Sequence, residues 1–276
     1  MRYIKEICLL LLCLLLLAGC QPAAANELTV TVLDVGQSDC TLVMQGDQVL
    51  MIDSGTATER EVVQYALHQR GIRRIDCLML THPHEDHTGN ARMLIEKYEI
   101  GMLLVSPVAT EDWGYDLILR EAQARGIPTV YAAAGDIYPL GDVTVEILSI
   151  LTDVKDLNDA SITFRLLYGE TSFLFTGDGE AAAERLLLEM VPREKLDCDF
   201  YKAGHHGSDS SSSAALLEAA TPAHVAISCG LYNDYGFPHG DLLERLEAVG
   251  ATVHRTDREG HLCYVSDGHK VIFQEK

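Results

Sequence analysis

The chain has 276 residues, with 21 basic and 41 acidic side chains and a formal net charge of −20 at pH 7. Such a charge repels polyanions at long range, and the sequence has no broad basic footprint for nucleic acid. Eight cysteines are present, but the five beyond residue 20 are odd in number and irregularly spaced, which argues against a disulfide framework.

The N-terminus has the pattern of an export signal. Two basic residues precede an apolar run over 7–17, which is shorter than the roughly 20 residues that a membrane span requires. The tetrad Leu-Ala-Gly-Cys that ends at Cys20 resembles a bacterial lipobox, and an uncleaved anchor with the same topology is the alternative. We expect a lipoprotein signal peptide over 1–20, a short tether over 21–27 and one domain over 28–276. Lipid on Cys20 would hold this domain at the outer face of a bacterial cell membrane.

Short apolar segments separated by turn residues predict that the domain begins with strands. Segments with helical spacing then alternate with further strands. The predicted strands of the first half cover 28–35, 40–45, 48–53, 75–80, 102–106 and 129–132, and its predicted helices cover 58–70, 89–98 and 115–125.

The second half again opens with strands and continues with alternating helices. Its predicted strands cover 143–150, 161–168, 172–175, 199–203, 223–228, 253–256 and 261–265, and its predicted helices cover 180–190, 211–220 and 241–249. This order predicts an α/β fold in which two sheets lie face to face with helices outside. We expect the functional site along one edge, where strand ends converge.

The densest group of metal-binding side chains directly follows the strand predicted at 75–80. Residues 81–90 read Thr-His-Pro-His-Glu-Asp-His-Thr-Gly-Asn, which places three imidazoles and two carboxylates within six positions. Imidazole nitrogen and carboxylate oxygen are common ligands of zinc and manganese. A loop that leaves a strand can turn His82 and His84 inward together, and Asp86 and His87 are then available for a second ion. Further residues of these types at later strand ends favour a metal site over a solvated loop.

The order of these motifs along the chain resembles the metallo-β-lactamase superfamily, and within it the hydrolase domain of ComEC-type DNA-uptake proteins. The motifs that carry the resemblance are Leu-Asp-Val-Gly-Gln-Ser-Asp at 33–39, Ile-Asp-Ser-Gly at 52–55, the histidine loop, Thr-Gly-Asp at 176–178, Gly-His-His-Gly-Ser at 204–208 and His-Arg-Thr-Asp at 254–257. The resemblance implies a four-layer αββα sandwich in a free-standing, exported form. It also implies two divalent ions, zinc or manganese.

The resemblance also implies roles for particular residues. It places two histidines on a first metal, Asp86 and His87 on a second, and a bridging carboxylate at Asp178. The later histidine ligand is expected at His205, with His206 as the alternative and the remaining one facing the substrate. The expected metal ligands are therefore His82, His84, Asp86, His87, Asp178 and His205. Behind them, Asp53 is expected to orient a ligand.

One departure from the family pattern concerns the first metal. Many members supply another histidine about twenty residues before the bridging aspartate, whereas residues 156–161 read Asp-Leu-Asn-Asp-Ala-Ser. Water or Asn158 would have to complete this site, which leaves the number and identity of the ions open.

The chemistry implied by such a centre is hydrolysis by a metal-activated hydroxide. Asp86 belongs to the reacting centre, and His206 or His239 is a candidate proton donor. The resemblance implies a phosphodiesterase that acts on DNA, although the net charge weighs against a polyanionic substrate. No protein partner is evident.

Other functions remain open at this stage. Phosphorylcholine esterases of teichoic acid are similar in site and location, and an acidic face suits a cationic choline. A cage for choline would need aromatic side chains, for which Trp113, Tyr232, Tyr235 and Phe237 are candidates. A thioester or lactam hydrolase and a catalytically silent binding module are further alternatives.

Overall fold

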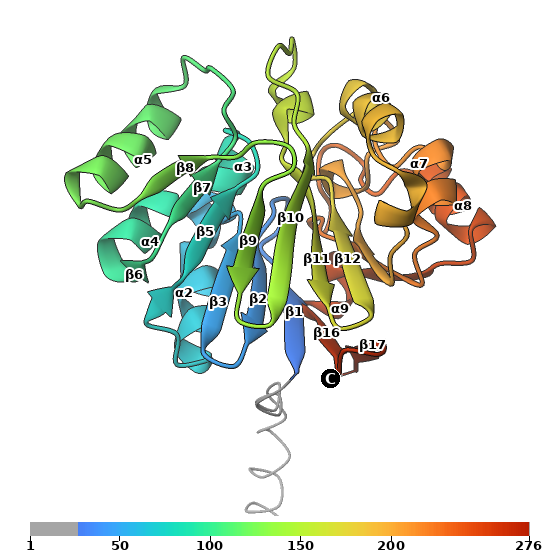
Figure 1. The fold of residues 1–276 in the computed structure, drawn as a ribbon, viewed down its shortest axis with the longest axis horizontal. Coiled ribbons are helices and arrows are strands. Elements are labelled where there is room, and N and C mark those ends of the chain that lie inside the picture. Colours follow the sequence, from blue (N-terminus) through green and yellow to red (C-terminus); the bar gives the residue numbers. More distant parts are fainter. Residues whose placement is uncertain (1–26, 276) are drawn as a thin grey trace, which may run out of the picture.

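The computed structural model describes residues 27–275. Two large β-sheets pack face to face and helices cover both outer surfaces, which confirms the predicted αββα architecture (Figure 1). The proposed signal peptide, Cys20 and nearly all of the tether lie outside the described residues. Across residues 27–275, no helix has the length and apolar character needed to cross a membrane.

The first large sheet has eight strands, and its central strands β3, β5 and β7 run parallel. In spatial order the strands are β17 (Val271–Gln274), β16 (Leu262–Ser266), β1 (Leu28–Val32), β2 (Thr41–Gln45), β3 (Gln48–Ile52), β5 (Cys77–Leu80), β7 (Leu103–Val105) and β8 (Thr129–Tyr131). A small separate sheet pairs β4 (Arg74–Ile75) with β6 (Glu99–Ile100).

The second large sheet has seven strands, of which β12 to β15 run parallel. In spatial order they are β15 (Thr252–Arg255), β14 (His224–Ile227), β13 (Phe200–Lys202), β12 (Thr171–Phe175), β11 (Thr163–Tyr168), β10 (Val143–Ser149) and β9 (Ile137–Leu140). The sequence pattern did not predict β17, at the edge of the first sheet, or β9. Strand β9 is an edge strand that contains Pro139, a residue that lacks the ladder donor and obscures a strand pattern.

The helices fill the connections between strands. The α-helices are α2 (Arg60–Gln69), α3 (Glu85–Thr88), α4 (Ala91–Lys97), α5 (Trp113–Ala124), α6 (Ala181–Met190), α7 (Ala214–Ala220), α8 (Gly240–Ala248) and α9 (Thr256–Glu259). Short 3₁₀ helices are η1 (Ala57–Glu59), η2 (Leu157–Ala160), η3 (Arg193–Lys195) and η4 (His205–Gly207).

Three buried apolar clusters hold the layers together. The central one joins the facing sheets and includes Leu50, Phe164 and Tyr264. A second packs α2, α4 and α5 on the first sheet, and a third packs α6, α7 and α8 on the second. Each large apolar side chain removed from water contributes about 1.5–3 kcal/mol, so these layers form a rigid base for the loops at the sheet edges.

The carboxyl ends of the parallel strands define one edge of the molecule. Asp53 follows β3, the histidine loop follows β5, and Asp178 comes shortly after β12. The domain starts at the opposite edge, because Leu28 pairs with Gln45, next to the β2–β3 turn. Figure 1 shows the start of β1 at the bottom of the sheets and α3 at the top.

Candidate metal centre

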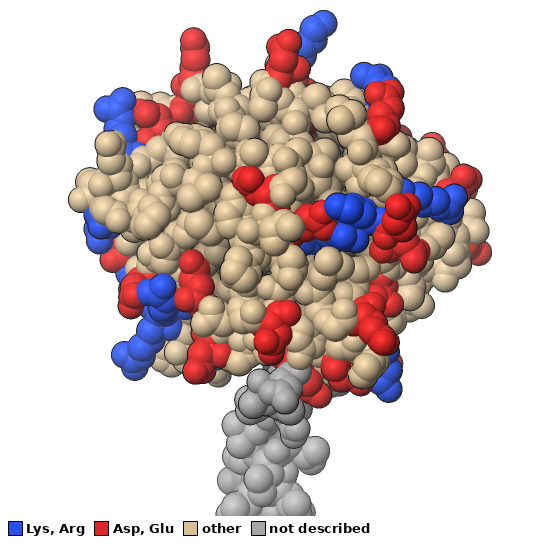
Figure 2. All heavy atoms as spheres, in the orientation of Figure 1, with Lys and Arg blue, Asp and Glu red and all other residues tan. Residues whose placement is uncertain are grey.

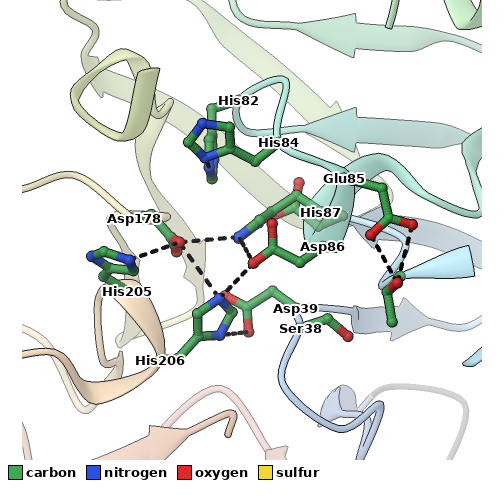
Figure 3. A network of polar contacts seen from close by, with 12 residues as sticks. Ser38, Asp39, His82, His84, Glu85, Asp86, His87, Asp178, His205 and His206 are labelled. Carbon is green, nitrogen blue, oxygen red and sulfur yellow. Dashed lines mark hydrogen bonds and ion pairs between the residues drawn. The ribbon is translucent and has the colours of Figure 1, made fainter. Parts of the chain in front are cut away.

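The histidine loop is fixed from behind by one of its two carboxylates. Glu85 accepts hydrogen bonds from Thr56 Oγ1 and from the backbone N–H of Ala57 at 2.8–3.0 Å. It therefore points away from the imidazoles, as Figure 3 shows. Of the two carboxylates in this loop, only Asp86 faces the centre.

His82 and His84 form the first group of candidate ligands. His82 Nε2 lies 3.1 Å from His84 Nδ1, close to the spacing of about 3.3 Å between two nitrogens on one tetrahedral zinc. His82 is fully buried, and burial holds its pKa well below the ordinary value, so its ring is neutral and able to bind a cation. The two rings fit one ion.

The second group contains two carboxylates and two imidazoles (Figure 3). His87 Nε2 lies 3.2 Å from Asp178 Oδ2 and 3.7 Å from Asp86 Oδ2. His206 Nε2 lies 3.1 Å from Asp86 Oδ2 and 3.5 Å from Asp178 Oδ2. One ligand atom from each of the four residues lies within 4.8 Å of all the others, which is the chemistry and spacing of a metal site.

Hydrogen bonds to the Nδ1 atoms of His87 and His206 orient the Nε2 atoms of both rings toward the candidate metal centre. His87 Nδ1 lies 2.8 Å from Asp53 Oδ2, and His206 Nδ1 lies 3.1 Å from the carbonyl oxygen of Ser228. Because these oxygens only accept, each Nδ1 donates, so in the neutral form that can bind a cation the Nε2 lone pair points toward the centre. Metal-binding histidines are commonly oriented in this way.

Asp53 is positioned to serve both the histidine loop and His87. Its carboxylate also accepts hydrogen bonds from Thr81 N and Thr81 Oγ1, each at 2.8 Å. The backbone at Asp53 has φ of +56°, a strained conformation that recurs at functional sites. Burial raises the pKa of Asp53, although the nearby His87 opposes this effect. The geometry agrees with the orienting role expected from the sequence.

Ser161 connects Asp178 to the first group of ligands. Its Oγ accepts the backbone N–H of Asp178 at 3.0 Å and lies 3.3 Å from His82 Nδ1. Gly177 leaves room for it, because a Cβ at Gly177 would meet Ser161 Oγ at 2.7 Å. The sequence analysis gave Ser161 no role.

Asn158 lies on η2 and lines the same cavity as Asp178. Its side-chain Oδ1 is buried and has no hydrogen-bond partner, as is also true of His87 Nε2 and Asp178 Oδ1. Buried polar atoms without partners are rare, and cations bound in this region would supply partners for them. These residues therefore fit a bound metal.

The geometry distinguishes the two adjacent histidines after β13. His206 is 2% exposed and belongs to the second group, whereas His205 is 21% exposed, with Nε2 3.9 Å from Asp178 Oδ2. His205 Nδ1 instead lies 3.1 Å from Glu180 Oε1. Both histidines have positive φ, and this tight turn sends the second ring inward. The geometry thus favours His206 as the ligand and His205 as the residue that faces the substrate, the reverse of the preferred expectation.

His239 is not brought into the centre. It precedes α8, and its Nδ1 accepts the backbone N–H of Asp209 at 3.1 Å. Its Nε2 lies 3.2 Å from the carbonyl oxygen of Tyr235. It is absent from the lining of the metal-centre cavity.

A buried ion pair behind the centre was missed by the sequence analysis. Lys202 Nζ lies 2.9 and 3.0 Å from the two carboxylate oxygens of Asp39 and donates to the carbonyl oxygen of Ala203 at 3.1 Å. Asp39 Oδ1 also lies 3.8 Å from His206 Nδ1. The available signal was a lysine within the otherwise apolar strand β13.

Mutual attraction shifts the pKa values of these groups. Burial alone would raise the pKa of Asp178 and Asp86, but the neighbouring imidazoles hold both well below the ordinary value. Burial alone would lower the pKa of His87 and His206, but the carboxylates raise both. A cation bound among the same carboxylates would compete with the histidine protons.

The centre opens into a cavity of about 340 Å³, lined by Gln37, His84, Glu85, Asp86, Asn158, Asp178, His205, His206, Tyr235 and Phe237. Tyr235 and Phe237 stack with ring centroids 5.3 Å apart and supply an aromatic wall. On the face that Figure 2 shows, Lys and Arg side chains are scattered, mostly beside Asp or Glu, and form no continuous basic patch.

A four-layer αββα sandwich with such a centre at its sheet edge defines a class of metal-dependent hydrolases. Residues 33–230 match the sequence model of the Metallo-beta-lactamase superfamily, and the chain belongs to this superfamily. The superfamily binds divalent metals, often as a pair, which agrees with the kind of cofactor expected.

The curated relatives are competence proteins of the ComEC type, as the sequence motifs predicted. The chain is 27% identical over 263 residues to ComE operon protein 3 of Bacillus subtilis, covering 88% of this chain and 34% of that protein. It is 28% identical over 268 residues to competence protein ComA of Neisseria gonorrhoeae, covering 91% and 35%. It is also 28% identical over 242 residues to recombination protein 2 of Haemophilus influenzae, covering 84% and 28%. The chain thus spans about a third of the length of these relatives.

Solved structures share the fold at low sequence identity. The metallo-beta-lactamase fold protein YhfI from Bacillus subtilis superimposes with a TM-score of 0.59 at 12% identity, covering 87% of this chain and all of YhfI. CmlA, a diiron beta-hydroxylase from Streptomyces venezuelae, superimposes with a TM-score of 0.56 at 16% identity, covering 85% and 53%.

Proposed function

We propose that this protein is a phosphodiesterase that hydrolyses DNA with two divalent ions, zinc or manganese. The observation that carries the proposal is the presence of two adjacent ligand groups at one cavity. His82 and His84 would hold one ion, with Asn158 beside it. Asp86, His87 and His206 would hold the other, and Asp178 would bridge the two.

DNA as the substrate is supported by the relatives, which are named as competence and recombination proteins. When bound, the two ions would supply an activated water and stabilise the charge that develops on the phosphate. They would also add about four positive charges at the cavity, which offsets the negative surface locally.

In this proposal His205 holds the proton for the leaving oxygen. It lines the cavity and is partly exposed, and the Glu180 carboxylate 3.1 Å from Nδ1 orients the ring. The sequence analysis considered His206 and His239 for this role. His206 is engaged with Asp86 and Ser228, and His239 with its own loop. Of these three histidines, His205 lines the cavity and is not among the proposed metal ligands.

A second candidate function is a phosphorylcholine esterase. Tyr235 and Phe237 form an aromatic wall in a cavity that also contains carboxylates, and a quaternary ammonium is attracted to both. The two candidates share the metal centre and differ only in what the cavity wall recognises.

The test uses purified protein from Gln21 onward, loaded with zinc or manganese. Substrates are bis-p-nitrophenyl phosphate, single-stranded DNA, double-stranded DNA and p-nitrophenyl phosphorylcholine. His82→Ala/Asp86→Ala is the inactive control, and His68→Ala removes an exposed histidine on α2 as the matched control. We expect metal-dependent DNA cleavage in the wild type and His68→Ala only. Turnover of phosphorylcholine without DNA cleavage would favour the esterase, and inactivity on every phosphodiester would refute both.

We also propose that lipid on Cys20 anchors the protein at the outer face of the bacterial cell membrane. The domain starts at the edge opposite the metal centre, so an anchor there would leave the cavity facing away from the surface. Cys20→Ala should move the protein from the membrane fraction to the soluble exported fraction. Unchanged membrane association would contradict lipid anchoring at this cysteine.

A further inference from the structure

A second cavity of about 380 Å³ adjoins the metal centre. Its lining includes Tyr232, Arg255 and Arg258, and it shares Phe237 with the first cavity. The two cavities are therefore neighbours that share one aromatic residue. None of the roles argued above uses the second cavity.

The loop between the two cavities is held in place by several hydrogen bonds. Asn233 Nδ2 donates to the carbonyl oxygens of Gly230 and Phe237, and Asn233 Oδ1 accepts the backbone N–H of Phe237. Gly230 N donates in turn to Gln37 Oε1, a residue of the metal-centre cavity. These bonds hold the loop in a fixed position beside the centre.

This fixed loop presents large apolar side chains to solvent. Tyr232 is 92% exposed, and Leu231 and Tyr235 are also exposed. Contiguous exposed apolar side chains mark binding surfaces, and exposed aromatic rings are the platforms on which unpaired bases stack in single-strand-binding proteins. The ring of Tyr232 is therefore a candidate stacking surface.

The charge of the cavity suits an anion. Arg255 is held by Asp257 through two hydrogen bonds at 2.7 and 2.9 Å. Arg258 is exposed, and among residues 27–275 no hydrogen bond or ion pair engages it. A free guanidinium binds phosphate well and opposes a quaternary ammonium. In a chain of net charge −20, this positive group lies beside the reaction site.

We propose that the second cavity binds the nucleotide next to the scissile phosphodiester of a single-stranded nucleic acid. Its base stacks on Tyr232 and its phosphate contacts Arg258. The inference rests on the proposed phosphodiesterase function and specifies the substrate as a polymer with unpaired bases. A duplex does not fit, because its base faces are stacked within the helix.

The binding test uses the inactive His82→Ala/Asp86→Ala protein and a fluorescein-labelled oligothymidylate of about six nucleotides, followed by anisotropy. Arg258→Gln should weaken binding about tenfold and make the dependence of log K on log salt shallower by about 0.7. Tyr232→Ala should also weaken binding about tenfold, with little change in salt dependence. A duplex of the same length should compete poorly.

The matched controls replace an exposed arginine and an exposed tyrosine outside the second cavity. Arg120→Gln alters an exposed arginine on α5, and Tyr65→Ala alters an exposed tyrosine on α2. Both should bind the oligonucleotide as the parent does. Equal losses in Arg258→Gln and Arg120→Gln would indicate unspecific charge attraction and overturn the inference. Wild-type binding by Arg258→Gln and Tyr232→Ala would overturn it as well.

An activity measurement separates failure of this inference from failure of the proposed function. Metal-loaded protein is assayed on bis-p-nitrophenyl phosphate, which has no neighbouring nucleotide, and on oligothymidylate. Arg258→Gln should lose about tenfold more kcat/KM on the oligonucleotide than on the small ester. Equal losses on both would overturn the second subsite, whereas inactivity of the wild type on both would refute the phosphodiesterase itself.

Discussion

Replacing Lys202 with methionine should strongly destabilise the metal-free protein. Lys202 is 4% exposed, and its ammonium forms an ion pair with Asp39 and donates hydrogen bonds to Asp39 Oδ2 and to the carbonyl oxygen of Ala203. Methionine fills similar volume without charge, so the Asp39 carboxylate would stay buried near Asp178 without its closest cation. Breaking one side of a buried ion pair costs about 3–5 kcal/mol.

The loss of stability in Lys202→Met should be visible in thermal unfolding and in the pH dependence of stability. At about 2–4 °C per kcal/mol, the thermal midpoint should fall by roughly 6–20 °C, measured by far-UV circular dichroism in the presence of a chelator. Burial alone would raise the pKa of Asp39, but Lys202, followed by His206 and His87, holds it below the ordinary value. Without Lys202 the pKa of Asp39 should rise above its unfolded value. The loss of stability should therefore shrink as the pH falls, because the protonated carboxyl no longer needs a cation.

The double variant Asp39→Asn/Lys202→Met provides the decisive comparison. It removes both charges and should regain most of the stability, since an uncharged pair leaves no buried ion. A loss below about 1 kcal/mol in Lys202→Met, or a double variant as unstable as the single one, would refute the reasoning.

Three further predictions concern the metal centre. Asp53→Asn keeps a residue that tolerates positive φ but removes the charge that orients His87. Metal affinity, measured by chelator-competition titration, should therefore fall about 10–100-fold. Unchanged affinity would exclude the orienting role. In the folded protein the pKa values of His87 and His206 are raised above 6.5, so their stabilisation is complete below pH 6.5 and is lost as the pH rises through the folded values. Urea unfolding in chelator should therefore show falling stability above that pH, and a flat profile would contradict the assigned carboxylate contacts. Gly177→Ala should displace Ser161 and strain a backbone with φ of +52°. The free energy of unfolding should fall by about 1–3 kcal/mol, and elemental analysis should find less bound metal. Wild-type metal content would show that the displacement of Ser161 does not affect metal binding.

The parts of the centre that depend on local sequence were predictable. His82, His84 and His87 lie within six positions of one loop, and the strand before that loop was evident from its apolar residues. Asp53 and Asp178 were assigned through the family resemblance, and the structure shows that each lies shortly after a strand of its sheet, β3 and β12 respectively. The architecture followed from the grouping of strands and helices, although an edge strand with a proline was missed.

Other parts depend on geometry that the sequence does not express. His205 and His206 are adjacent and chemically identical, and their different positions arise from a turn with two consecutive positive φ values. The ion pair of Lys202 with Asp39 joins residues 163 positions apart, one in β13 of the second sheet and the other in the loop between β1 and β2 of the first. No spacing rule connects such residues. The lysine in β13 therefore indicated a buried charge but did not identify its partner.

The division of the ligands between the two sheets has a consequence for assembly of the protein. Asp86 and His206 are 120 positions apart, and an ion held by both would join the two sheets in the way that a disulfide joins distant segments. Closing a loop of this length in an unfolded chain costs about 5 kcal/mol of entropy, so the unfolded chain cannot bring both halves to one ion at low concentration. We therefore expect an ion shared by these residues to bind after the second sheet has formed. Its release during unfolding should coincide with the separation of the two sheets.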